Sequence, residues 1–86
     1  MEPAAKKPVR VTIFHQQYAL LTQGDPREVE VVAQTVDDLM VSIASKAPTA
    51  DSTRIAVLAC LELADKLRSL EQKTAQLNLL LGQLVE

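Results

Sequence analysis

Apolar residues recur at alternating spacings of four and three along the last third of the chain, from residue 52 to residue 86. This spacing is typical of a helix that packs against another helix in a left-handed coiled coil. One helix cannot bury such a stripe by itself, so the pattern predicts an oligomer. The row consists of Ala56, Cys60, Leu63, Leu67, Leu70, Thr74, Leu77, Leu81 and Leu84.

The helix that carries this row is expected to begin near residue 52, with Thr49, Asp51 or Ser52 as its cap. Apolar residues cover most of the circumference in its first turns and then narrow to the stripe. A helix that is apolar all round is usually buried, whereas a narrow stripe faces one partner. We therefore expect the start of this helix to belong to a head and residues 63–86 to form a coiled-coil stalk.

Two interfaces are expected along this helix. The first is a dimer seam made of Ala56, Cys60, Leu63, Leu67, Leu70, Thr74 and Leu77. Lys66 at heptad position g and Glu71 at the following e position favour parallel pairing. Near the end the stripe widens, which indicates that more than two helices meet there. This second, tetramer interface is predicted to comprise Leu77, Leu80, Leu81, Leu84 and Val85.

The first part of the chain has the pattern of a β-hairpin. Alternating β-branched residues predict a strand at about residues 9–14, and a second run predicts its partner at about 18–22. The residues between them, 15–17, are expected to form the turn. A lone hairpin is marginal in water, so it should pack on a helix or extend into a sheet with another chain. Residues 1–8 are expected to be a disordered tail.

A first helix is predicted at about residues 26–45. Asp25 can cap its free amides and Pro26 suits the first helical position. Pro48 separates this helix from the next one. The fold class is therefore α+β, with a head at residues 9–62 built from a hairpin and one helix, followed by the long C-terminal helix. The expected core face of the first helix comprises Val29, Val32, Ala33, Val36, Leu39, Met40 and Ile43.

Three segments, residues 11–18, 36–40 and 51–59, resemble the ZapA family of bacterial cell-division proteins, and the resemblance covers nearly all the chain after residue 8. It implies a head on a parallel dimer whose stalks pair end-on into an antiparallel tetramer. It also implies a cytoplasmic protein at mid-cell that binds FtsZ and cross-links its protofilaments. His15 stands where the family usually has Gly, and Lys46 alone stands where the family head often carries several basic residues.

The composition of the chain argues against several classes of function. The 9 Lys and Arg residues against 11 Asp and Glu give a net charge of −2 without a basic block, which argues against nucleic-acid binding. No segment resembles a signal peptide or a membrane span, so no direct membrane contact is expected. Cys60 is the single cysteine, and we expect a reduced cytoplasmic protein in which this thiol is a small buried filler.

No catalytic, metal or cofactor site is predicted. His15 is the only histidine and lacks an evident ligand set, so a turn role is favoured over catalysis or metal binding. Asp37 and Asp38 are adjacent in a helix and point about 100° apart, so a solvated face is favoured over an acid/base pair. The chain contains no phosphate loop and no nucleophile with a matching base, which excludes an enzyme.

Three charged residues, Lys46, Asp51 and Arg54, are candidates for contact with a partner protein. Arg54 lies in the first turn of a helix, where the helix dipole disfavours a cation. We expect it to pair with Asp51 or with a carboxylate of another subunit, and direct contact with a partner stays as the alternative.

Two competing functions remain open. The main one is a coiled-coil module that tethers a different protein partner through the apolar surface at the end of the stalk. A DNA-bound dimer is a third class, which the acidic isoelectric point of about 5.3 disfavours.

Overall fold

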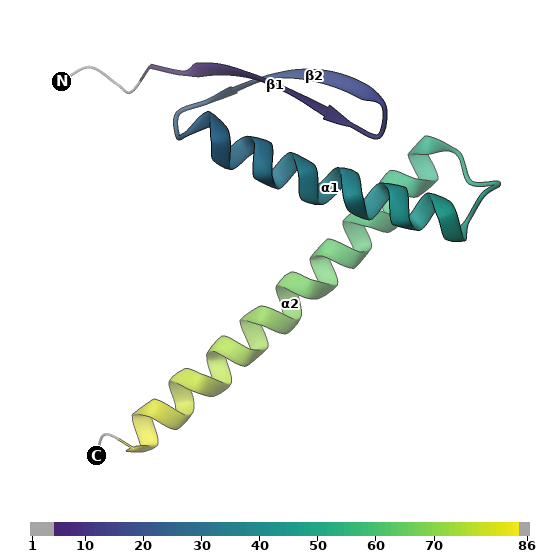
Figure 1. The fold of residues 1–86 in the computed structure, drawn as a ribbon. Helices are drawn as coiled ribbons and strands as arrows, with labels where there is room; N and C mark the ends of the chain where they lie inside the picture. Colours follow the sequence, from purple (N-terminus) through teal and green to yellow (C-terminus); the bar gives the residue numbers. More distant parts are fainter. Residues whose placement is uncertain (1–4, 85–86) are drawn as a thin grey trace.

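The computed structural model describes residues 5–84 as a β-hairpin followed by two helices (Figure 1). The elements are β1 at Lys7–Ile13, β2 at Gln16–Thr22, α1 at Pro26–Lys46 and α2 at Ser52–Leu84. This order confirms the predicted α+β class. The hairpin lies along α1, while α2 crosses the C-terminal half of α1 and then continues beyond the other elements (Figure 1).

The hairpin is longer, and its turn tighter, than the sequence predicted. Ile13 pairs with Gln16, so the turn consists of Phe14 and His15 alone and not of residues 15–17. Both turn residues have positive φ angles, 48° and 69°, as type I′ turns require. This turn matches the twist of the two strands, which lets pairing continue up to the turn. The placement of Phe14 in the first strand was therefore wrong.

The first strand also begins earlier than expected. β1 starts at Lys7, so residues 7 and 8, which we had assigned to the tail, belong to the hairpin. A two-stranded sheet has only edge strands, and an edge strand tolerates a proline such as Pro8. Residues 1–4 of the predicted tail lie outside the described residues.

Both helices begin at aspartate caps. The side chain of Asp25 accepts a hydrogen bond of 2.9 Å from the backbone N–H of Arg27 at the start of α1. That backbone bond, together with hydrogen bonding from the Arg27 side chain, holds the pKa of Asp25 below its usual value. Asp51 accepts a bond of 2.8 Å from the backbone N–H of Arg54, which identifies it among the three candidate caps of α2.

Among the described residues, the core consists of two small clusters that meet at Ile13. The first lies between β1 and α1 and is formed by Val9, Val11 and Ala33, with Val29 at its margin. The second lies between the two helices and is formed by Met40, Ile55 and Ala59. Ile13 packs against both clusters, so the end of β1 connects the hairpin to the helix pair.

Candidate functional site

The stalk has no packing partner within residues 5–83. Leu63 is half-buried, but every side chain from residue 64 to residue 83 is exposed. Leu67 and Leu70 of the predicted seam are 57% and 62% exposed. Thr74 donates its hydroxyl to the Leu70 carbonyl at 2.9 Å, so the one polar member of this stretch is satisfied by its own helix. The stripe is therefore a continuous apolar surface that a second helix could cover.

The stripe widens near the end of α2, as the sequence predicted. Leucines occupy positions 77, 79, 80 and 81, and together they spread the apolar surface over more than one side of the helix. Leu84 is the last helical residue, but its side chain and the whole of Val85 lie outside the described residues. The exposed leucines of the tip are Leu77, Leu79, Leu80 and Leu81.

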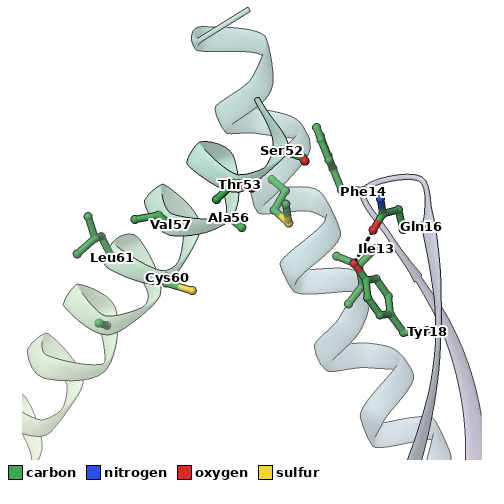
Figure 2. A pocket seen from close by; sticks show the side chains of 12 residues that line it. Ile13, Phe14, Gln16, Tyr18, Ser52, Thr53, Ala56, Val57, Cys60 and Leu61 are labelled. Atoms are coloured by element: carbon green, nitrogen blue, oxygen red, sulfur yellow. Dashed lines mark hydrogen bonds between the residues drawn. The ribbon is translucent and has the colours of Figure 1, made fainter. Parts of the chain in front are cut away.

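An open hollow of about 640 Å³ continues this apolar surface into the head (Figure 2). It lies between the turn end of the hairpin and the first turns of α2. One wall comes from the hairpin and α1, and the other comes from α2. The lining residues are Ile13, Phe14, Gln16, Tyr18, Met40, Ser52, Thr53, Ala56, Val57, Cys60, Leu61 and Ala64.

The inner face of the hairpin is only half covered. In the strand register, Val9 lies opposite Leu20 and Val11 lies opposite Tyr18, and opposite residues share a face of the sheet. The two valines are buried against α1, whereas Leu20 and Tyr18 are both 42% exposed. The Tyr18 hydroxyl donates a bond of 2.9 Å to the Gln16 side chain at the rim of the hollow (Figure 2).

Cys60 is exposed in the single chain, so its burial as a small filler of the dimer seam stays a prediction. Its sulfur points from α2 toward the hairpin side of the hollow (Figure 2). The reason is the angle at which α1 meets α2. α1 covers the line of Ile55 and Ala59, and Cys60 lies about 100° further around the helix. Ala56, four residues earlier, is half-buried.

The three candidate partner contacts lie at or near the connection between α1 and α2, and all are exposed. Asp51 is occupied as the cap of α2, and it binds the backbone of Arg54 rather than its guanidinium. Within residues 5–83 no carboxylate lies within 4.0 Å of the Arg54 or Lys46 side-chain nitrogens. The expected Arg54–Asp51 ion pair is therefore replaced by a cap, and two cations face solvent here.

On the stalk, Lys66 lies 3.8 Å from Glu62 of the same helix. An exposed pair of this kind contributes about 0.3–0.5 kcal/mol at most. Lys66 therefore has an ion-pair partner on its own helix. The pairing that the sequence suggested, between Lys66 and Glu71 of a second chain, would be an additional one.

Asp37 is a residue whose position the sequence pattern did not reveal. We had placed it on the solvated face of α1 with Asp38, but it is half-buried. Its Oδ1 accepts a bond of 2.7 Å from the backbone N–H of Phe14 in the hairpin turn. Asp38 is exposed and accepts only the Gln34 side chain at 2.9 Å. A signal was present, because Asp37 lies one helical turn after the buried Ala33.

Within residues 5–84, no three His, Cys, Asp or Glu side chains gather in an arrangement that could hold a metal ion. Neither α1 nor α2 of the described chain has the length and apolar composition that a membrane crossing requires.

Comparisons with known proteins agree with this geometry. A family model described as cell division protein ZapA matches residues 9–84. A cell division protein ZapA from Geobacillus sp. WCH70 is 35% identical over 63 residues, which are 73% of this chain and 72% of the relative. A cell division protein ZapA from Bacillus thuringiensis Al Hakam is 29% identical over 73 residues, 85% and 82% of the two chains.

One solved structure also resembles this chain along almost its whole length. It is described as a ZapA mutant dimer from Geobacillus stearothermophilus. It is 30% identical, has a TM-score of 0.75 and covers 94% of each chain. The hairpin, α1 and the long α2 are thus found together in a protein that was solved as a dimer.

Proposed function

Because the chain belongs to the ZapA family of non-enzymatic cell division proteins, we propose that it is an adaptor that binds FtsZ and cross-links its protofilaments. It acts in the cytoplasm at the division site. The observation that carries the proposal is the continuous apolar surface that runs from the hollow of the head to the tip of α2. A monomer would leave that surface in water, which costs about 25 cal/mol per Å² of apolar area.

The first step of the proposed assembly is a parallel dimer. A two-fold axis along the stalk places each residue of the stripe opposite its own copy, so that the interface uses the same patch on both chains. The hollow adjoins the stripe at Ala56 and Cys60, so in the proposed dimer it would face the second chain. The dimer would therefore cover the hollow, Leu63, Leu67, Leu70, Thr74 and Leu77 in one continuous interface, with the two heads at the same end.

The second step is an antiparallel tetramer formed by the stalk tips. Leu77, Leu80 and Leu81 are exposed on the described helix, and Leu84 and Val85 complete the proposed interface. At about 1.5 Å per residue, a stalk of residues 63–84 is about 33 Å long. Two such stalks that point toward each other and overlap only at their tips would therefore hold the two pairs of heads roughly 50 Å apart.

Bundling follows from this geometry. FtsZ forms repeating polymers, and each head needs only weak affinity for them. Once one head is bound, its partners are held at an effective concentration in the millimolar range, so avidity can exceed the single-site affinity by about 10²–10⁴-fold. The proposed contact surface on the head lies at the connection between the helices. There the positive side chains of Lys46 and Arg54 could bind an acidic surface of the partner, and Asp51 caps the start of α2.

The experiment is co-sedimentation of the full-length chain with assembled FtsZ, scored for binding and for bundling by light scattering. Leu70→Glu places a charge in the seam, while Gln72→Glu places the same charge two residues further on, away from the stripe. The original chain and Gln72→Glu should bind and bundle. Leu70→Glu should still bind through single heads but should bundle far less.

Two results would count against the proposal. Equal bundling by Leu70→Glu would show that paired heads are not needed, which removes the cross-linking mechanism. Absence of binding in every form would favour the tethering module, for which the exposed leucines of the stalk tip are the supporting observation.

A further inference from the structure

The hairpin turn has a backbone conformation that non-glycine residues adopt only rarely. Phe14 and His15 are the two non-glycine residues with positive φ angles in the described chain. In this region the Cβ atom crowds the backbone, and type I′ turns prefer Asn and Gly for that reason. Phe14 does not offer that relief, and His15 tolerates a positive φ better than most residues but less well than glycine, so a contact from outside the turn would stabilise it.

The compensating contact comes from α1, 23 residues away. Oδ1 of Asp37 accepts the backbone N–H of Phe14 at 2.7 Å. A bond from an amide to an ionised carboxylate is stronger than one between neutral groups, and this one is half-buried, where water competes less. The Phe14 side chain adds a second contact by packing against the cluster of Met40, Ile55 and Ala59.

The hairpin turn also positions one wall of the hollow. Ile13 and Gln16, the residues on either side of the turn, both line it, and so does Phe14. With negative φ angles at Phe14 and His15, the chain would leave the turn in another direction and these side chains would move. The shape of the hollow therefore depends on a contact that lies outside it.

We infer that Asp37 is a positioning residue for self-association: by fixing the left-handed turn at Phe14 and His15, it shapes the surface of the head that receives the second chain. The inference rests on the proposed function, because it takes the hollow to be part of the dimer interface. Asp37 does not line the hollow itself.

The test compares Asp37→Asn with Asp38→Asn in the full-length chain. Both changes remove one charge from adjacent positions of α1, but only Asp37 binds the turn. Two quantities are measured, the exchange protection of the Phe14 amide by NMR and the dimer dissociation constant by sedimentation. Asp37→Asn should lower the protection about tenfold, since a neutral acceptor replaces a charged one. It should weaken the dimer by at least about tenfold, because each dimer has two such turns. Asp38→Asn should change neither quantity.

A second variant separates positioning from general damage. His15→Gly removes a Cβ from the left-handed position, so that the turn needs less outside support. Adding it to Asp37→Asn should restore most of the dimer affinity without restoring the strength of the hydrogen bond from the Phe14 amide. If Asp37→Asn does not fold, the double variant is measured against His15→Gly, and the same loss of Phe14 protection is expected.

The outcomes are distinguishable. Unchanged protection of the Phe14 amide in Asp37→Asn would overturn the role of Asp37 and would leave the proposed dimer interface intact. Lowered protection with unchanged dimer affinity would show instead that the turn held by Asp37 does not shape the surface used in self-association. Failure of His15→Gly to restore affinity would show that Asp37 acts by some route other than the turn.

Discussion

The head and the stalk share one helix but differ in where their apolar residues find partners. In the head, the first turns of α2 place Ile55 and Ala59 against α1, and both are 3% exposed. In the stalk, the same helix presents Leu67 and Leu70 to solvent. The head can thus form its core within one chain, whereas the stalk needs a second chain. One long helix joins a folding unit to an assembly unit.

This difference predicts how each region should respond to mutation. A change in the head core should act within the chain and should not depend on concentration. A change in the stalk stripe should act between chains and should therefore depend on chain concentration. Three substitutions, in order of expected effect, test this distinction.

Leu70→Glu should have the largest effect. Burying a leucine contributes about 1.5–3 kcal/mol, and each dimer loses two such side chains. The dimer should weaken by about 3–6 kcal/mol, which is roughly a hundredfold to ten-thousandfold in the dissociation constant. Sedimentation equilibrium over a range of concentrations measures this change, with Gln72→Glu as the matched control. If the mass of the Leu70→Glu assembly did not change at any concentration, the stripe would not be the seam.

Ile55→Ala should have the next largest effect, and it should act on the head. Removing a buried isoleucine leaves a cavity and typically costs about 2–5 kcal/mol of unfolding free energy. Urea unfolding should therefore shift to lower denaturant, and the shift should be similar at low and high chain concentration. Val31→Ala on the exposed side of α1 is the control. An equally small shift for both variants would mean that the second core cluster does not hold α2 against α1.

Leu81→Glu should have the smallest effect, because it should separate dimers from one another and leave most of the seam intact. Loss of the leucine should weaken tip pairing by about 1.5 kcal/mol per chain, the lower end of the range for a buried leucine, while each dimer keeps its seam. Mass measurement should then show dimers at concentrations where the original chain forms tetramers. Gln83→Glu, two residues further on, tests whether any added charge at the tip has this result. A tetramer that survives Leu81→Glu would refute the proposed tip interface.

Local patterns in the sequence were enough to predict the elements. The helix of residues 26–46 was recognisable from Asp25, Pro26 and a one-sided apolar row, because capping and periodicity act within a few residues. The long α2 was recognisable from its heptad row for the same reason. Its exposed leucines could also be anticipated, since one helix cannot cover its own stripe.

Only the tertiary structure decided which neighbouring residue is buried. Ala59 and Cys60 are adjacent and both suit a core, yet Ala59 is buried and Cys60 is exposed. The crossing angle of α1 and α2 determines which of the two residues is buried. That angle depends on all the side chains that pack between the helices. The same holds for Val32, which belongs to the apolar row of α1 but is 63% exposed.

The hairpin turn shows the same limit most clearly. The alternation of residues 9–14 predicted a strand and a hairpin, but it placed the turn after Phe14. The turn at Phe14 and His15 is held by Asp37, which lies 23 residues away on another element. The sequence by itself determined the elements and the apolar stripe, because both follow from local periodicity. The register of the turn and the shape of the hollow were decided by a contact between distant residues, which no local pattern encodes.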